Sequence, residues 1–301
     1  MNEKRIIKEL YKGANPSYWD DCYLLDGKYL ITTDSLSENT HFRHDWSSPS
    51  DLACKLITLN CSDIISSGGI PTIAFLNLGL SSHSKQTKWL NSFIKEFKKL
   101  LKHYKIELAG GDTYSSSITN LTLTLFGIVK RPVTRIGAKI GDSIYITGSL
   151  GLSILGLKYL EGNIDLPPKL KKEALEKHLC PQVRFFPKKD LPILKKITSM
   201  MDISDGLYQD SQKLSIASDV HLQIDINTIP LFDKYFEYLT IDEILNSGEE
   251  AEYLFTYRGD LPESSIYSKI GLVTSGKAQV TFKLNQKKYS PQYKGFVHFE
   301  K

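Results

Sequence analysis

Apolar residues along this chain follow two different periods. From residue 84 to 104 they recur every three or four positions, at Trp89, Phe93, Phe97, Leu100, Leu101 and Tyr104. This spacing predicts a helix that packs on one side. Residues 73–80 and 121–129 are instead short runs of apolar and β-branched residues, which predict strands.

The same reasoning predicts further elements throughout the 301 residues. In chain order they are a hairpin over 22–33 turned by Asp26-Gly27, a helix over 51–67 capped by Ser50, a strand over 106–109 that ends in Gly110-Gly111-Asp112, a strand over 143–147, a helix after Gly151, helices near 169–179, 187–197 and 207–217, and strands near 220–226, 252–258 and 278–283. This alternation of helices and strands predicts an α/β or α+β fold.

Residues 131–142 (RPVTRIGAKIGD) interrupt the pattern with proline, two glycines and basic residues that show no periodicity. Such a change in composition is typical of a domain boundary. We therefore expect two domains, an N-terminal domain over 1–136 and a C-terminal α/β domain over 137–301.

Charge and targeting signals narrow the class of protein. The net charge is +4, and the densest group of lysines follows the helix predicted over 84–104. This grouping indicates a solvated helix face, so we expect no nucleic-acid partner. The N-terminus lacks the apolar segment of a signal peptide, and no apolar run approaches the ~20 residues that span a bilayer. We expect a cytoplasmic protein without a membrane partner.

The cysteines fit that location. The chain has four, Cys22, Cys54, Cys61 and Cys180, with no C-x-x-C spacing and too few for a disulfide framework. We therefore expect free thiols in a reducing compartment.

Acidic residues recur beside small residues at the predicted strand ends and turns: Asp20-Asp21, Thr32-Thr33-Asp34, Ser62-Asp63, Gly111-Asp112-Thr113 and Asp202-Ile203-Ser204-Asp205-Gly206. Any one of them alone is more often turn chemistry than a site. Carboxylate and hydroxyl oxygens are, however, the ligands that Mg²⁺ prefers. A polyphosphate would be repelled by so many carboxylates unless divalent cations lay between them. The set therefore predicts a magnesium-dependent enzyme that uses ATP.

Two residues stand out within that set. Asp63 lies inside an apolar helix, in register with Leu56 and Leu59, where a buried carboxylate needs a cation or hydrogen bonds. A helix that reaches the surface at Asp63 is the alternative. His41 follows the Asp34 segment and is as consistent with packing as with a site. The P-loop pattern G-x-x-x-x-G-K-[ST] is absent, which excludes a P-loop enzyme.

Eight segments, in order along nearly the whole chain, match the motifs of one known family: 19–22 (WDDC), 32–42 (TTDSLSENTHF), 60–63 (NCSD) followed by Gly68, 110–113 (GGDT), 135–142 (RIGAKIGD), 202–206 (DISDG), 252–256 (EYLFT) and 294–299 (KGFVHF). On these segments the chain resembles the thiamine-monophosphate kinases. They form a branch of the superfamily that includes aminoimidazole ribonucleotide synthetase and selenophosphate synthetase. The match is much more specific than any single motif.

The resemblance implies a kinase of thiamine biosynthesis, which phosphorylates thiamine monophosphate to thiamine diphosphate by direct transfer from ATP. It also implies a homodimer whose N-terminal sheets pair, with ATP in the groove between the domains. By position, the magnesium ligands would be Asp21, Thr32, Thr33, Asp34, Asp63, Asp112, Asp202 and Asp205, and Asp34, Asp63 and Asp112 would be the catalytic ones. ATP would contact Gly111, Asp112, Arg135, Ser204 and Tyr104. Thiamine monophosphate would contact His41, Glu249 and Tyr293, the last being tryptophan in most of the family.

Some segments depart from the family pattern. Trp19 replaces a glycine, Glu250 and Ala251 replace an aspartate and an aromatic residue, and Val297 replaces another aspartate. The last three positions lie in segments linked to the acceptor substrate, whereas the proposed metal ligands are all present.

Two alternatives stay open at this point. One is another ATP-dependent synthetase of the superfamily. Against two of its branches, the chain has no reactive cysteine in a Gly-rich N-terminal loop and ends Phe299-Glu300-Lys301 without a terminal cysteine. The other alternative is a nucleotide-binding homologue without catalytic activity.

Overall fold

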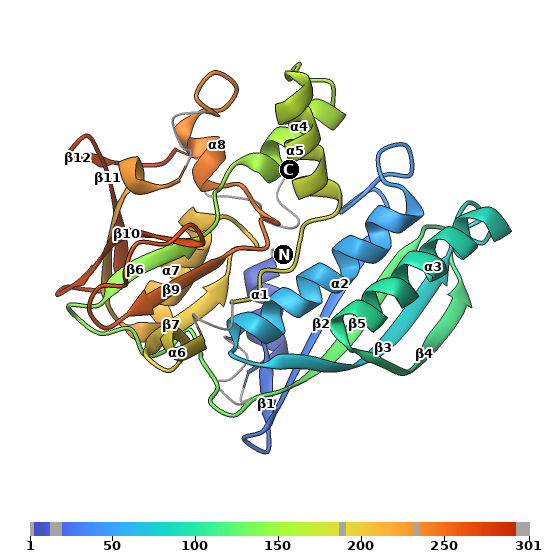
Figure 1. The fold of residues 1–301 in the computed structure, drawn as a ribbon, viewed down its shortest axis with the longest axis horizontal. Helices are drawn as coiled ribbons and strands as arrows, with labels where there is room; N and C mark the ends of the chain where they lie inside the picture. Colours follow the sequence, from blue (N-terminus) through green and yellow to red (C-terminus); the bar gives the residue numbers. More distant parts are fainter. Residues whose placement is uncertain (1–2, 13–19, 187–190, 231–234, 293–301) are drawn as a thin grey trace.

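The computed structural model describes residues 3–12, 20–186, 191–230 and 235–292. Within these residues the chain builds two β-sheets, and helix α2 (Pro49–Ser66) lies between them (Figure 1). Of the α/β or α+β fold predicted from the alternating elements, this arrangement confirms the α+β form.

The N-terminal sheet has the strand order β1-β2-β5-β3-β4. Its strands are β1 (Tyr23–Leu25), β2 (Tyr29–Ser37), β3 (Ile70–Leu80), β4 (Glu107–Ser115) and β5 (Asn120–Ile128). Neighbouring strands are antiparallel except β3 and β4, which are parallel. A parallel pair needs a crossover connection, and helix α3 (Thr87–Tyr104) supplies it.

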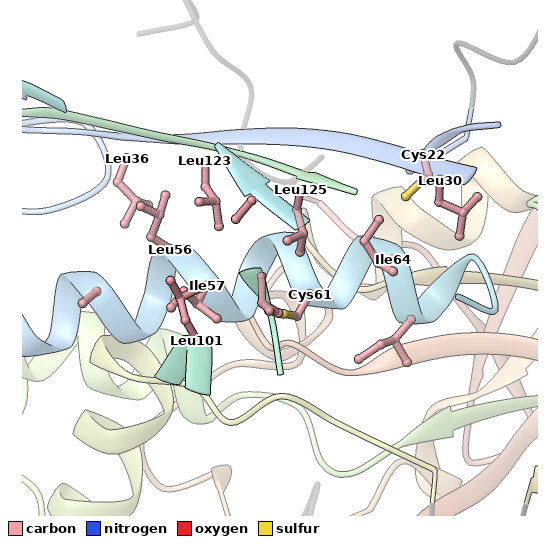
Figure 2. Packing of buried hydrophobic residues seen from close by; sticks show 14 of the residues in the cluster. Cys22, Leu30, Leu36, Leu56, Ile57, Cys61, Ile64, Leu101, Leu123 and Leu125 are labelled. Carbon is pink, nitrogen blue, oxygen red and sulfur yellow. The ribbon is translucent and has the colours of Figure 1, made fainter. Parts of the chain in front are cut away.

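Helices α2 and α3 cover one face of this sheet (Figure 1). In β5 the buried residues Leu121, Leu123 and Leu125 alternate with partly exposed threonines, because successive side chains of a strand point to opposite faces. Figure 2 shows Leu123 and Leu125 directed at α2, where Leu56 and Ile64 lie on the side that faces the sheet. This packing fixes which face of the sheet looks toward the helix and which face looks away.

Helix α2 begins two residues before the predicted start. Ser48, and not Ser50, is the N-cap: its hydroxyl accepts from the N–H of Asp51, and the Asp51 carboxylate accepts from the N–H of Ser48 at 2.9 Å. Pro49 occupies the first turn, where its missing N–H costs no hydrogen bond. The reciprocal bonds satisfy two backbone donors that Ser50 would leave without partners.

The C-terminal sheet has the order β12-β11-β8-β10-β6-β9-β7. Its strands are β6 (Ser143–Thr147), β7 (Ile197–Asp202), β8 (His221–Asp225), β9 (Tyr253–Tyr257), β10 (Tyr267–Thr274), β11 (Gln279–Leu284) and β12 (Lys287–Tyr289). The remaining helices are α1 (Glu3–Leu10), α4 (Leu152–Leu160), α5 (Pro168–Leu179), α6 (Leu191–Leu194), α7 (Leu207–Ser218) and α8 (Ile241–Leu245), with the short 3-10 helix η2 (Ile226–Thr228). Strand β7, at one edge, packs against α2 and so brings the second sheet to the first.

Several predicted elements need correction. The strand predicted over 106–109 continues through Gly110-Gly111 as β4, because the parallel neighbour β3 supplies backbone partners along its whole length. Of the helix predicted near 187–197, the described part is helical only over Leu191–Leu194, and Ile197 already belongs to β7. Strand β10 was not predicted, since Gly271 interrupts its apolar pattern.

The prediction of four free thiols is wrong for two of them. Cys54 of α2 and Cys180, at the end of α5, form a disulfide across 126 residues of sequence. Spacing along the chain cannot reveal such a pair, because only the fold brings the two residues together. Cys22 and Cys61 are free and buried.

No helix in the described part of the chain is long and apolar enough to cross a bilayer.

Candidate functional site

The inner face of β2 brings polar side chains to helix α2. Thr32 and Asp34 are two residues apart in β2 and therefore share the face that looks toward α2. The Thr32 hydroxyl donates to Asp63 Oδ2 at 2.6 Å, and the N–H of Asp34 donates to Asn60 Oδ1 at 3.2 Å. The carboxyls of Asp34 and Asp63 lie close enough to share a hydrogen bond.

Two more carboxylates join Asp63 from distant parts of the sequence. Asp21 precedes β1, and Asp202 is the last residue of β7. Asp21, Asp63 and Asp202 each offer an oxygen, and these three oxygens lie within 4.8 Å of one another. The Asp21 carboxylate is held by the hydroxyl of Ser66 at 2.9 Å and by the N–H of Asp202 at 3.3 Å.

This crowding makes the negative charges costly. Burial raises the pKa of Asp63 well above its ordinary value, and the charges of Asp34, Asp202 and Asp21 raise it further. Burial and then Asp21 likewise raise the pKa of Asp202. For Asp34, burial and Asp21 raise the pKa to about 6. The four acids lie where a cation would be strongly favoured.

Arg135 provides part of that positive charge. Its guanidinium donates to Asp21 Oδ1, and its backbone N–H donates to Asp20 Oδ1 at 2.7 Å. The Nε atom of Arg135 is buried and has no hydrogen-bond partner among the described residues. One guanidinium does not neutralise four neighbouring carboxyls, so the cluster retains an excess of acidic groups.

Residues of helix α7 hold the turn that follows β7 in place. The Asp210 carboxylate accepts from the backbone N–H groups of Ser204 at 3.1 Å and Asp205 at 3.0 Å. Lys213, one turn later in α7, contacts Asp205 at 2.5 Å and Asp210 at 2.7 Å. Asp205 and Ser204 are therefore fixed next to Asp202 at the edge of the acidic cluster.

A second group of charges adjoins this turn. Lys55 of α2, only 3% exposed, forms an ion pair with Glu249 at 2.6 Å. Glu249 has a left-handed backbone (φ +54°), and its N–H donates to the carbonyl of Ser204 at 2.9 Å. Burial opposes ionisation of Glu249, but the charge of Lys55, its hydrogen bond and the nearby histidines together outweigh burial and lower the pKa of that carboxyl. His41 lies near enough for its charge to act on Glu249, and its Nδ1 accepts from the N–H of Ser37 at 3.0 Å.

The departures Glu250 and Ala251 lie beside Glu249, and both are buried. The Glu250 carboxylate accepts from the N–H of Gly151 at 2.7 Å, at the start of α4, and from the Ser247 hydroxyl at 2.5 Å. Burial nevertheless raises the pKa of Glu250. The longer side chain is therefore accommodated by the beginning of α4 and not directed at the acidic cluster.

Some of the other residues expected at the site lie on the opposite face of the sheet. Thr33 points to the opposite face of the sheet, where its hydroxyl meets that of Thr124 at 3.1 Å. Gly111 and Asp112 are exposed on β4, the edge strand, and Asp112 is aligned with Asn77 on the face away from α2. The ring of Tyr104 packs against that of Phe185 at 5.6 Å. Tyr293 lies outside the described residues, as do Trp19 and Val297.

The structure adds three candidate functional residues that sequence reasoning missed: Lys55, Asp210 and Lys213. Lys55 is a lysine in the most buried part of a largely apolar helix, which is an unusual place for a charge. Asp210 and Lys213 are three residues apart in a helix that follows a predicted metal segment, a spacing that pairs charges on one helix face. These two signals were present in the sequence.

The residues present fit a divalent metal. The carboxylates of Asp21, Asp63 and Asp202 and the hydroxyl of Thr32 are hard oxygen donors from four different parts of the chain. The raised pKa values of Asp63 and Asp202 show that the group is unfavourable without positive charge. Nitrogen and sulfur ligands, which zinc and copper sites use, do not take part in this group.

Matches to known protein families identify the class of protein to which the chain belongs. Residues 19–129 match the family described as AIR synthase related protein, N-terminal domain, and residues 139–276 match AIR synthase related protein, C-terminal domain. The chain is thus an AIR synthase related protein. The first matched range contains the N-terminal sheet, and the second contains strands β6 to β10 of the C-terminal sheet.

Relatives identify the branch. The chain is 42% identical to the thiamine-monophosphate kinase of Leptospira interrogans over 99% of this chain and 98% of that protein. The crystal structure of thiamine monophosphate kinase from Aquifex aeolicus superposes with a TM-score of 0.83 at 29% identity, covering 96% of this chain and 97% of the other. A structure described as AaThiL complexed with AMPPCP and TMP gives a TM-score of 0.84 at 27% identity, covering 99% and 97%. The chain belongs to the thiamine-monophosphate kinase family, as the motifs predicted.

Proposed function

We propose that this protein transfers the γ-phosphoryl group of ATP to thiamine monophosphate and so forms thiamine diphosphate. The observation that carries the proposal is the convergence of Asp21, Asp63 and Asp202 within 4.8 Å in a chain of this family. Phosphoryl transfer requires little covalent chemistry from a protein, so positioning and charge neutralisation can supply most of the catalysis.

The acidic cluster would bind magnesium and thereby hold the polyphosphate. Asp21, Asp34, Asp63 and Asp202 would be ligands, with Asp205 at the edge of the cluster. Magnesium bound there would neutralise the phosphate oxygens and stabilise the charge that develops during transfer. Thr32 orients Asp63 through its hydrogen bond, and Arg135 orients Asp21. The backbone at Ser204, held by Asp210, would lie along the nucleotide.

The acceptor would bind at the group around Glu249. Thiamine monophosphate has a cationic ring at one end and a phosphate at the other. Glu249 offers a carboxylate that keeps its negative charge, which suits the cationic ring. We assign His41 to the phosphate end and Tyr293 to the ring, as the family motifs imply.

Gly111, Asp112 and the side chain of Thr33 fit this function only if two copies associate, since all three lie on or beside the outer face of the N-terminal sheet. Exposed apolar side chains gather on that face: Ile70, Ile73, Phe75, Tyr114 and Ile128. We propose a homodimer that pairs these faces, which would place Gly111 and Asp112 beside the partner.

We place the domain boundary at 136–137, in the segment that joins the two sheets.

Incubating the purified protein with ATP, magnesium and thiamine monophosphate tests the proposal. We expect thiamine diphosphate and ADP in equal amounts, and no product when EDTA removes the divalent cation. Consumption of ATP without thiamine diphosphate would instead favour a synthetase of the same superfamily. Binding of ATP with no reaction at all would favour a homologue without catalytic activity.

A further inference from the structure

We propose that the disulfide between Cys54 and Cys180 is a redox-controlled link that holds the acceptor side of the site in its binding arrangement. The proposal rests on the function proposed above, because the side in question is the one assigned to thiamine monophosphate. Oxidised protein would bind this acceptor more tightly than reduced protein, and ATP would bind equally to both.

The link joins the two parts of the molecule next to the Glu249 group. Cys54 belongs to α2, which packs on the N-terminal sheet, and Cys180 ends α5 on the other side. The next residue of α2 is Lys55, which forms the ion pair with Glu249. One turn further along, the Thr58 hydroxyl donates to the carbonyl of Pro181 at 2.9 Å.

These contacts form a continuous set along the first turns of α2. Cys54 and Thr58 are four residues apart and share one helix face, so both reach the segment that follows α5. A few residues later, Arg184 donates to both oxygens of Glu252, at 2.9 and 2.6 Å. Glu252 lies three residues after Glu249. The disulfide therefore restrains the segment 180–184 at Cys180. The contact between Arg184 and Glu252 ties the other end of this segment to the acceptor side.

The rest of this connection is non-covalent. Without the disulfide, α2 and the segment after α5 are joined at this point by the Thr58 hydrogen bond, a single contact whose net contribution is small. A covalent link limits the arrangements that α5 and Pro181 adopt relative to Lys55. Restricting a site to its binding arrangement increases affinity by reducing the ordering that binding requires.

The geometry allows a reductant to reach the link from one side. Cys54 is buried and Cys180 is partly exposed, so a thiolate would attack the sulfur of Cys180. With a dithiol as reductant, a mixed disulfide forms at Cys180 while Cys54 leaves as a thiolate and takes up a proton. The second thiol of the reductant then closes its own disulfide and releases Cys180 as a thiol. Two electrons and two protons pass from the dithiol to the two cysteines.

Steady-state kinetics of the whole enzyme, before and after treatment with dithiothreitol, test the proposal. Peptide mapping by mass spectrometry first establishes that Cys54 and Cys180 are linked in one sample and free in the other. We expect reduction to raise the KM for thiamine monophosphate by about threefold to tenfold and to leave the KM for ATP unchanged. The variant Cys180→Ser should behave like the reduced enzyme in both states. The double variant Cys54→Ser/Cys180→Ser should do the same, which controls for other effects of the reductant.

Three results would overturn the proposal. The first is a pair of free thiols at 54 and 180 in protein kept under oxidising conditions. The second is an equal KM for thiamine monophosphate in both states together with a lower melting temperature after reduction, which would make the disulfide a structural crosslink only. In both cases turnover remains, so the proposed kinase activity stands. The third is neither turnover nor calorimetric binding of thiamine monophosphate in either state, which would overturn the proposed function and this inference together.

Discussion

Asp63 contacts Thr32 and lies within reach of the carboxyls of Asp21, Asp34 and Asp202. Replacing it by asparagine removes a metal-binding charge but almost no volume. We expect Asp63→Asn to lower kcat by about 100-fold or more and to leave the circular dichroism spectrum unchanged. Asp34→Asn should behave in the same way.

The matched control for these variants is Asp165→Asn, because Asp165 is exposed in the loop between α4 and α5. It should keep the activity of the unmodified enzyme. Near-normal turnover in both Asp63→Asn and Asp34→Asn would show that the cluster is structural and that our metal assignment is wrong.

The buried side chain of His178 should make the free energy of unfolding depend on pH. Burial and then the nearby charge of Lys55 lower its pKa to about 4, against the opposing charge of Glu249, and its Nδ1 lies 3.2 Å from the Ser153 hydroxyl. The unfolded chain takes up this proton below about pH 6.5 and the folded chain does not, so stability is present above pH 6.5 and is lost as the pH falls. Between pH 7 and pH 5 this one residue should reduce the free energy of unfolding by about 2 kcal/mol.

Urea unfolding at pH 7, 6 and 5 measures this effect. In His178→Gln, which cannot be protonated, the decrease should be smaller by that amount. Parallel curves for the two proteins would show that His178 titrates normally in the fold.

At the level of single residues, sequence predicted the acidic cluster better than its surroundings. Asp21, Asp63 and Asp202 stand in motifs with a recognisable spacing, and the fold brings them together. The pairing of Lys55 with Glu249 spans 194 residues and depends on how α2 meets the second sheet. No local pattern encodes such a contact, so it could not be predicted from the chain alone.

Helix α2 is the element on which most of the site depends, since it carries Lys55, Asn60 and Asp63. Its start is fixed by the reciprocal bonds of Ser48 and Asp51. We expect Ser48→Ala to lower the free energy of unfolding by about 1 kcal/mol, as is usual for the loss of a helix cap. Urea unfolding measures this loss.

Ser50→Ala is the matched control, because Ser50 is the residue that the sequence pattern favours as the cap. Its hydroxyl contacts that of Ser92 at 3.2 Å and makes no cap bond. A larger loss of stability in Ser50→Ala than in Ser48→Ala would contradict the assignment of the cap.

Elements whose apolar residues recur with a clear period were predicted with nearly correct ends. Elements whose extent depends on pairing with neighbouring strands were not. Helix α3 and strand β5 follow clear patterns of apolar residues, and both lie within three residues of the predicted ends. Strand β4 contains two consecutive glycines, which weaken any local preference for a strand, and it extends because β3 pairs with it. Strand β10 similarly depends on pairing with β6 and β8.

For the whole molecule, the outer face of the N-terminal sheet tests the proposed homodimer. Phe75 is 37% exposed there, and its ring contacts that of Phe126 at 5.8 Å. We expect Phe75→Asp to convert the dimer to a monomer in light scattering, because a buried unpaired charge would strongly disfavour the interface. Ile216→Asp is the control, since Ile216 is 68% exposed on α7 in the other domain. A dimer that survives Phe75→Asp would place the interface elsewhere. An unmodified chain that scatters as a single copy would show that the protein is a monomer.

The acidic cluster has a further consequence for the metal-free protein. Folding brings Asp21, Asp34, Asp63 and Asp202 from separate parts of the chain into one crowded place. The raised pKa values of Asp34, Asp63 and Asp202 indicate that this crowding is unfavourable near neutral pH. The residues that make the site active therefore weaken the empty enzyme, a trade-off between stability and activity. Without metal, Asp63→Asn should melt at a higher temperature than the unmodified protein. Added magnesium should then raise the melting temperature of the unmodified protein more than that of the variant. The difference between the two melting temperatures should therefore decrease, or change sign, as magnesium binds.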